Sequence, residues 1–182
     1  MMKATGIVRR IDDLGRIVMP KEIRRTLHIR ESDPLEIFTD REGQVILKKY
    51  SPIGEMTTFA KQYAESLAQV SGHATLIADR DQFIAVSGGC KQLLNKSVSR
   101  QLEEKVNNRE TVIAAKGDRN YVNIAEDIAV DYAWQLITPI ICEGDPIGAV
   151  ALLSRDPKAK PGEAELKLVS TAAGFLGRQM EG

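Results

Sequence analysis

The sequence predicts an α+β protein with two domains, a small β-rich module over residues 1–52 and a larger α/β sandwich over residues 53–182. Short β-branched runs separated by turn residues fill the first fifty positions, whereas longer amphipathic helices alternate with apolar strands after Ser51-Pro52-Ile53-Gly54. The charge also changes sign, from eight Lys/Arg against three Asp/Glu over residues 1–30 to 14 against 17 over residues 53–182. A basic end on a chain with no net charge favours a polyanionic partner for the first module.

The first module is expected to form two hairpins around a short helix. Pro20 can begin that helix because its missing N–H is not needed at the first helical position. Gly15 and Gly43 supply the positive φ that tight turns require. The expected elements are strands over residues 5–11 and 16–19 around a turn at 12–15, a helix over 21–27, and strands over 35–39 and 44–50 around a loop at 40–43. No internal repeat is evident.

The second domain is expected to place helices at both ends of a set of strands. The expected helices cover residues 55–70, 91–107 and 163–180, and the expected strands cover 74–78, 83–86, 111–115, 133–142 and 146–154. The first and last helices carry apolar stripes with small residues among them, which favours close packing. Packing against the sheet and packing in a bundle with a second copy are both open.

Arginine is concentrated in the stretch TGIVRRIDDLGRIVMPKEIRRTL. Its guanidinium keeps its charge and presents a fork of donors that suits phosphates and guanine edges. Neighbouring strand residues point to opposite faces, so Arg9 and Arg10 cannot both meet one flat surface. The alternative is that about half of the arginines are solvated or paired with nearby acids. A helix-turn-helix is excluded because one short helix lies between strands. We therefore predict duplex DNA as partner, bound largely through phosphates and groove shape with degenerate sequence preference.

The first module is too small to be stable alone. Domains of this size usually need a metal, disulfides or a partner. The chain has two cysteines, Cys90 and Cys142, and two histidines, none in metal-ligand spacing, so no metal and no cofactor are predicted. Dimerisation is the remaining route, and a two-fold pair of basic edges also suits the geometry of duplex DNA.

The stretch TGIVRRIDDLGRIVMPKEIRRTLHI, followed by DPLEIFTDREGQVILKKY, closely resembles the AbrB/MazE-like swapped-hairpin family of bacterial transcription regulators. The resemblance implies that two chains interlace their hairpins into one β-barrel-like dimer, with basic residues of the first strand, the loop and the short helix facing DNA. The matching DNA-binding residues are Arg9, Arg10, Arg16, Arg24 and Arg25. His28 and Ser32 stand where the family usually has glycine, and His28 is expected to be a tolerated helix cap.

The order of the two parts resembles that of two-domain sporulation regulators of endospore formers, whose second part is GAF-like. The resemblance implies a tetramer, paired through swapped hairpins in the first domain and through terminal helices in the second. It also implies a place at the nucleoid of the forespore. The sequence shows no signal peptide and no apolar run long enough to span a membrane, which predicts a cytoplasmic protein.

Four further residues have plain structural interpretations. Cys90 and Cys142 are expected to be small apolar residues, since no His, Asp or Lys is spaced to activate either thiol. His73 is expected to cap the helix before it. Trp134 is expected in the core, and the alternative is that it lines a ligand pocket.

The sequence thus predicts a sequence-tolerant, double-stranded-DNA-binding regulator of sporulation genes, both activator and repressor, that is not an enzyme. Its GAF-like domain is expected to assemble the tetramer, and sensing of an unknown small-molecule effector is a hypothesis. Two alternatives stay open. A MazE-type antitoxin would carry a disordered acidic tail in place of a second domain. A thiol enzyme built on the GAF fold would need a reactive cysteine.

Overall fold

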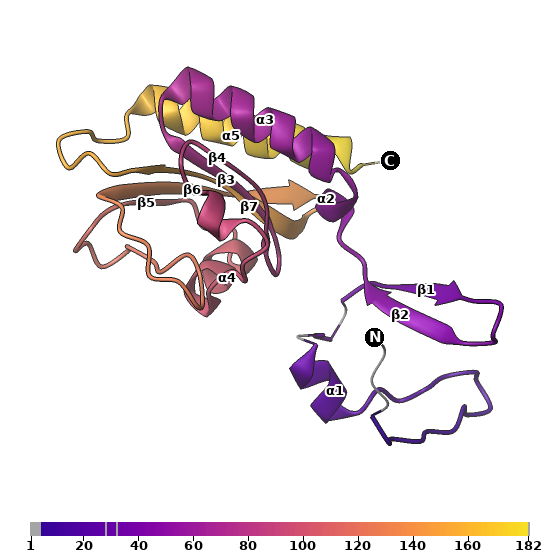
Figure 1. The fold of residues 1–182 in the computed structure, drawn as a ribbon. Helices are drawn as coiled ribbons and strands as arrows, with labels where there is room; N and C mark the ends of the chain where they lie inside the picture. The colour runs from indigo at the N-terminus through magenta and orange to yellow at the C-terminus, as the bar shows by residue number, and fades with distance from the viewer. Residues whose placement is uncertain (1–4, 28, 32, 182) are drawn as a thin grey trace. The chain divides into compact units, whose positions relative to one another are not determined.

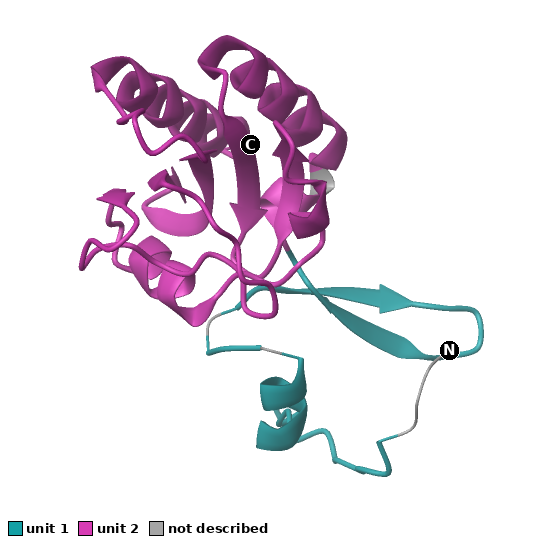
Figure 2. Ribbon diagram, turned by 60° about the vertical axis from the view of Figure 1, so that its left-hand side comes forward, with its two compact units in different colours: residues 1–50 teal, residues 51–182 magenta. Residues whose placement is uncertain are grey.

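The computed structural model describes residues 5–27, 29–31 and 33–181, so the expectations for His28 and Ser32 lie outside the described residues. The chain divides into two compact units, Met1–Tyr50 and Ser51–Gly182 (Figure 2). Unit 1 contains the helix α1 (Lys21–Thr26) and an antiparallel hairpin of β1 (Leu35–Thr39) and β2 (Val45–Lys49). These elements confirm the helix and the second hairpin predicted from the sequence.

The two strands predicted over residues 5–11 and 16–19 are not present as strands. Between them lies the predicted turn, in which the Asp12 N–H donates to the Arg16 carbonyl at 3.0 Å and the Gly15 N–H donates to the Asp12 carbonyl at 3.0 Å. Gly15 has a φ of +75°, which glycine adopts without strain. A strand is defined by its ladder to a neighbour. Among the described residues no strand pairs with either segment.

Unit 1 has little core of its own. Among its described residues Pro20 alone is buried. The segments beside the turn leave Val8 85% and Val18 74% exposed. One face of the β1–β2 hairpin carries Ile37, Leu47 and Val45, which are 66%, 45% and 66% exposed. Such apolar faces are typical of surfaces that another chain covers.

Unit 2 is built on a five-stranded antiparallel sheet in the order β4-β3-β7-β6-β5. The strands are β3 (Ala74–Asp79), β4 (Phe83–Ser87), β5 (Val112–Ala115), β6 (Trp134–Cys142) and β7 (Asp145–Ser154). The helices are α2 (Pro52–Glu55), α3 (Thr57–Ser71), α4 (Arg100–Asn107) and α5 (Glu163–Gln179), with a short 3-10 turn at Lys91–Leu93. The helices α3 and α5 lie side by side on one face of the sheet, and α4 lies on the other (Figure 1).

Each face of the sheet has its own core. Along β6, Leu136 and Ile140 belong to the core under α3 and α5, whereas Ile137 belongs to the core under α4. This division follows from the alternation of side chains along a strand. Trp134 is 2% exposed in the core beneath the two long helices, which confirms its predicted packing role. No helix in the described part of the chain is both long and apolar enough to cross a bilayer.

Small residues let α5 approach the sheet closely. Ala172 and Ala173 are buried, and a Cβ added at Gly177 would lie 2.1 Å from the Ile141 carbonyl oxygen. Gly174, one turn earlier, faces open space. The predicted packing of the small residues against the sheet is therefore present within one chain.

The helix predicted over residues 91–107 was wrong in its first half. Asn95 has a φ of +60°, its N–H donates to the Phe83 carbonyl at 2.8 Å, and the Phe83 N–H donates to the Lys96 carbonyl at 3.0 Å. These bonds tie the segment to the start of β4 instead of to a helix. The helix α4 begins only at Arg100, after its N-cap Ser99, whose hydroxyl accepts a hydrogen bond from the Leu102 N–H at 3.1 Å.

The capping role predicted for His73 was also wrong. Gly72, with a φ of +71°, ends α3 in the left-handed conformation, and its N–H donates to the Ala68 carbonyl. His73 follows this cap residue in the sequence, and its ring packs edge-on against Trp134, with 4.8 Å between ring centroids.

Candidate nucleic-acid interface

The turn between residues 12 and 16 is organised by one carboxylate. Asp12 Oδ1 accepts the N–H of Leu14 at 3.0 Å and of Arg16 at 2.8 Å. Asp12 Oδ2 accepts a hydrogen bond from Nε–H of Arg16 at 2.8 Å, while 68% of the Arg16 side chain stays exposed. The ion pair therefore orients the guanidinium without covering it, and the remaining donors of its fork face solvent.

The same turn occurs a second time in unit 1. In the β1–β2 loop, Asp40 Oδ1 accepts the N–H of Glu42 at 3.0 Å and of Gln44 at 2.9 Å. Gly43 takes a φ of +81°, as Gly15 does in the first turn. Both turns read Asp-x-x-Gly-x, as DDLGR and DREGQ. The shared signal is an aspartate and a glycine at fixed spacing, which is a recurring turn motif.

Hydrogen bonding holds the pKa of Asp12 below its ordinary value. The hydrogen bond from the backbone N–H of Arg16 lowers this pKa most, and desolvation, the next-largest effect, opposes it. Weaker hydrogen bonds from the Arg16 side chain and the Leu14 N–H lower it further. A carboxyl whose pKa is lower in the folded chain stabilises the fold above its unfolded pKa. That stabilisation is lost as the pH falls through the folded pKa.

We expect the turn to loosen at acidic pH and to be intact at neutral pH. In an NMR titration, the amide signals of Leu14 and Arg16 should move together as Asp12 takes up its proton below its ordinary pKa. An Asp12→Asn variant should show no such transition in these two amides. Titration of the wild-type amides above the ordinary aspartate range would contradict the bond pattern of the turn.

The other four predicted arginines are exposed as well. Arg9 and Arg10 precede the turn, and Arg24 and Arg25 occupy the last turn of α1. Among the described residues none forms an ion pair or a side-chain hydrogen bond with these four. The two helical arginines are neighbours in sequence and diverge by about 100° around the axis. The structure thus brings Arg9, Arg10 and Arg16 to one turn and its preceding segment, and places Arg24 and Arg25 on a separate element.

Neither cysteine has the surroundings of a nucleophile. Cys90 is fully buried, its thiol donates to the Ser87 carbonyl at 3.0 Å, and burial is the main cause that raises its pKa. Desolvation, with Glu143, Glu181 and Asp145 nearby, also raises the pKa of Cys142. A raised pKa keeps a thiol protonated and unreactive. Within the described residues no group of three His, Cys, Asp or Glu side chains could hold a metal ion.

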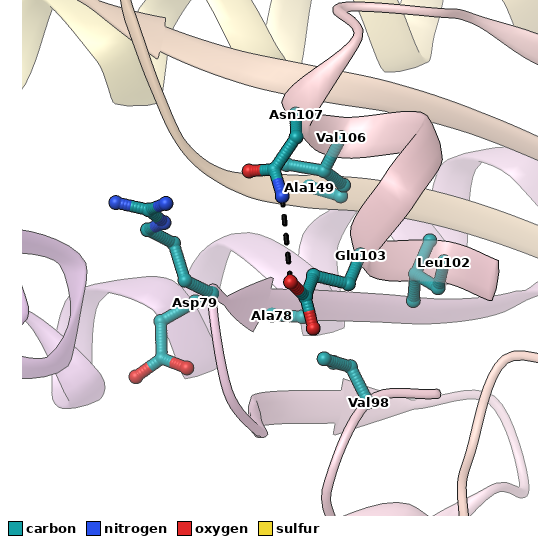
Figure 3. A pocket seen from close by; sticks show the side chains of 9 residues that line it. Ala78, Asp79, Val98, Leu102, Glu103, Val106, Asn107 and Ala149 are labelled. Atoms are coloured by element: carbon teal, nitrogen blue, oxygen red, sulfur yellow. Dashed lines mark hydrogen bonds between the residues drawn. The ribbon is translucent and has the colours of Figure 1, made fainter. Parts of the chain in front are cut away.

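Unit 2 contains a hollow that the sequence did not predict. It lies between β3, β7 and α4 (Figure 3), and the volume within it that is open to a water molecule is about 10 Å³. The floor is apolar and the rim is polar, and the lining residues are Ala78, Asp79, Arg80, Val98, Leu102, Glu103, Val106, Asn107 and Ala149. At the rim, Asn107 Nδ2 donates to Glu103 Oε1 at 3.4 Å. No local pattern signals this site, because its residues come from segments far apart in the sequence.

Two family models match the chain. Residues 55–181 match the model described as stage V sporulation protein T C-terminal, transcription factor. Residues 8–55 match the model described as antidote-toxin recognition MazE, bacterial antitoxin.

Two curated proteins of Bacillus subtilis (strain 168) are similar in sequence. Stage V sporulation protein T is 58% identical over 181 residues, which cover 99% of each chain. Transition state regulatory protein AbrB is 42% identical over 108 residues, which cover 59% of this chain and 93% of AbrB.

Unit 2 resembles a solved GAF domain, that of Acinetobacter phosphoenolpyruvate-protein phosphotransferase. The TM-score is 0.53 at 15% identity, over 70% of this chain and 87% of the other. This likeness concerns the fold alone. Together the matches confirm the predicted fold class, α+β with an AbrB-like module followed by a GAF-like domain.

Proposed function

The chain belongs to the family of stage V sporulation protein T, transcription factors with an AbrB-like DNA-binding domain, and on this basis we propose a specific mode of action. The protein binds duplex DNA with tolerant sequence preference, and it activates some sporulation genes and represses others. Residues 1–52 serve as the DNA-binding domain, and residues 53–182 serve as the assembly and sensor domain. The protein acts in the cytoplasm of the forespore, at the nucleoid.

The observation that carries this proposal is the exposure of five arginines on unit 1. Arg9, Arg10, Arg24 and Arg25 are exposed, and Arg16 is held by Asp12 with its outer donors available. These five are the proposed DNA-binding residues. Exposed guanidinium groups bind phosphates with release of counterions, so the affinity falls steeply with salt. Fluorescence anisotropy of labelled duplex DNA across a salt series tests the proposal. Weak binding that salt does not change would contradict it.

We propose that unit 1 is a dimer of swapped hairpins. The apolar side chains beside the first turn and on the β1–β2 hairpin are the ones that such a dimer would bury, and they include Val8, Val18, Ile37 and Val45. The segments over residues 5–11 and 16–19 would find their missing strand partners in the second chain. This accounts for why a single chain does not pair them.

Two dimers are proposed to join into a tetramer through α3 and α5. An aromatic cluster joins the two helices, with Tyr63 and Phe175 stacked at 5.7 Å between centroids and Phe59 5.8 Å from Phe175. Phe175 is 39% exposed, and Val70 on α3 is 73% exposed. Large exposed aromatic residues are frequent anchors of protein interfaces.

We expect Phe175→Ala to convert the tetramer to dimers at low micromolar concentration. Loss of a central aromatic anchor typically costs about 2 kcal/mol or more, roughly 30-fold in the dissociation constant. Sedimentation equilibrium of the full chain measures the change. Ser170→Ala, on an exposed position of the same helix about 140° around its axis from Phe175, is the matched control and should remain tetrameric. A Phe175→Ala variant that stays tetrameric would place the interface elsewhere.

We propose that the hollow of unit 2 receives the small-molecule effector. Its lining combines apolar and polar side chains, as ligand sites typically do. A thermal-shift screen with nucleotides, amino acids and spore-related metabolites tests this. A ligand at a hundred times its Kd stabilises the folded chain by about 2.7 kcal/mol. No stabilisation across a broad library would count against sensing.

The alternatives have less support. An antitoxin of MazE type was expected to end in a disordered acidic tail, and residues 51–182 form a sheet with two cores. A thiol enzyme was expected to need a reactive cysteine, and the surroundings of both cysteines raise their pKa values. We therefore propose a regulator that is not an enzyme.

A further inference from the structure

The two turns of unit 1 share one backbone design, and only the first of them holds an arginine. In each turn the N–H of the aspartate donates to the carbonyl four residues later, from Asp12 to Arg16 at 3.0 Å and from Asp40 to Gln44 at 3.2 Å. In each, the glycine N–H donates back to the aspartate carbonyl. In each, Oδ1 of the aspartate accepts two backbone N–H groups. The chain therefore contains the same scaffold with an arginine and without one.

The side chains at the third and fifth positions make the two turns differ. Arg16 Nε donates to Asp12 Oδ2 at 2.8 Å, whereas Gln44 Nε2 donates to Glu42 Oε2 at 3.0 Å. Glu42 is the third residue of its turn, and the corresponding residue of the first turn, Leu14, has no acceptor in its side chain. The sequence DDLGR thus directs its arginine to the aspartate, and DREGQ directs its glutamine to the glutamate.

The Asp12 carboxylate is a fixed anchor for the guanidinium of Arg16. The backbone N–H groups of Leu14 and Arg16 hold the carboxylate at 3.0 and 2.8 Å. An exposed ion pair is usually weak because two flexible side chains must be ordered to form it. Here the turn itself orders the carboxylate, and Arg16 is also bound at its own backbone N–H and carbonyl. The direction of the guanidinium is therefore set before a partner binds.

The bond to Asp12 also decides which donors of Arg16 remain for a partner. Because Nε is occupied, the donors on offer are those of the terminal nitrogens Nη1 and Nη2, on a side chain that is 68% exposed. These nitrogens form a forked end that matches the O6 and N7 acceptors of guanine in the major groove. The negative charge of Asp12 beside Arg16 weakens the attraction of this guanidinium for a phosphate. The pair is thus better suited to a directed contact with a base than to a contact with the DNA backbone.

We propose that Asp12 is a positioning residue for base reading, which presents Nη1 and Nη2 of Arg16 to O6 and N7 of a guanine in duplex DNA. The other four proposed DNA-binding arginines, which form no ion pair with an acid in the described part of the chain, bind phosphates and supply affinity without sequence information. One preset arginine among five gives a weak preference for guanine, in keeping with tolerant binding. This inference rests on the proposed binding of DNA by unit 1.

The test uses the full-length protein and duplexes that differ in one acceptor atom of guanine. Duplexes that bind the wild-type chain are selected from a random pool and are then remade with 7-deazaguanine, which lacks N7 but keeps its base pairing and its charge. Fluorescence anisotropy gives the ratio of the affinities for the guanine duplex and the 7-deazaguanine duplex. Asp12→Asn keeps an oxygen that can accept the backbone N–H groups of the turn, but it carries no charge. Asp40→Asn is the matched control, since it makes the same change in the turn that has no arginine.

The wild type should prefer the guanine duplex by at least about fivefold, the lower end of the discrimination that one bidentate pair provides. Asp12→Asn should lose most of this preference, while its affinity for the 7-deazaguanine duplex should rise because a negative charge has left the DNA-binding face. Arg16→Ala should lose the preference as well, and the double variant should lose no more than Arg16→Ala alone. Asp40→Asn should keep the wild-type ratio.

Other outcomes separate this role from a purely structural one. If Asp12→Asn lowers the affinity for both duplexes alike, Asp12 only maintains the turn, and the positioning role is overturned. Equal effects of Asp12→Asn and Asp40→Asn on the ratio would overturn it too. A wild-type chain that binds both duplexes equally, with a steep salt dependence, would overturn base reading by Arg16 and leave the proposed function intact. Binding that salt does not change would overturn the proposed function itself, a distinct result.

Discussion

Replacing Arg16 and Arg24 together by alanine should flatten the salt dependence of DNA binding. Each guanidinium that contacts a phosphate adds about 0.9 to the slope of log K against log salt. In a dimer the double variant removes four guanidinium groups, so the slope should fall by about two to four units if at least half of them contact phosphates. Binding at low salt should weaken by at least about tenfold, since each lost contact also removes a favourable charge interaction.

The control for this experiment removes the same charge from unit 2. Arg100 and Arg119 are exposed arginines of unit 2 that lie outside the proposed DNA-binding residues and outside α3 and α5, and Arg100→Ala/Arg119→Ala changes the net charge equally. This variant should keep the wild-type slope. If both double variants flatten the slope alike, the dependence reflects overall charge, and unit 1 is not the site. If the loss of Arg16 and Arg24 leaves DNA affinity unchanged, unit 1 serves in dimerisation or in binding another partner instead.

Gly177→Ala should be among the most destabilising single substitutions in unit 2. The added Cβ would lie 2.1 Å from the Ile141 carbonyl oxygen, a backbone atom of β6 that cannot turn aside. The helix α5 must therefore move off the sheet, and overpacking of this kind costs about 1–3 kcal/mol and sometimes more. At about 2–4 °C per kcal/mol for a chain of this size, the Tm should fall by roughly 5–10 °C.

Gly174→Ala is the matched control on the same helix. No atom lies within 4 Å of a Cβ there, so alanine should be neutral or should stabilise the helix by up to about 1 kcal/mol through its better helix propensity. Urea denaturation followed by far-UV circular dichroism compares the two variants. Equal stability of the two would mean that α5 does not pack on β6 as closely as the structure places it.

Much of the fold could be predicted from local pattern. The apolar stripe of α5, the strands β6 and β7 and the β1–β2 hairpin were all predicted to within a few residues. One prediction failed because the backbone of the segment hydrogen-bonds to a part of the chain that is distant in sequence. Residues 95–98 bond to the turn and strand around Phe83 instead of extending α4. A second, local error is that Gly72 rather than His73 ends α3.

The sequence predicted which arginines form the candidate interface, but it did not predict their geometry. A sequence shows that arginines gather near an aspartate, but only coordinates show that Asp12 orients Arg16 while leaving Arg9 and Arg10 to solvent. The hollow and the hydrogen bond between Ser51 and Asp79 had no local sequence signal, because each joins residues that are distant in sequence. Ser51 and Asp79, for example, are 28 positions apart.

The sequence by itself determined the α+β class, the placement of basic charge in the first fifty residues and the apolar stripes of the long helices. These follow from periodicity and composition, which act between near neighbours. The tertiary structure alone decided which face of the sheet each strand residue covers, where α5 touches β6 and which carboxylate the Ser51 hydroxyl binds. Such contacts join residues that are distant in sequence, and their energies depend on the packed arrangement of the whole sheet.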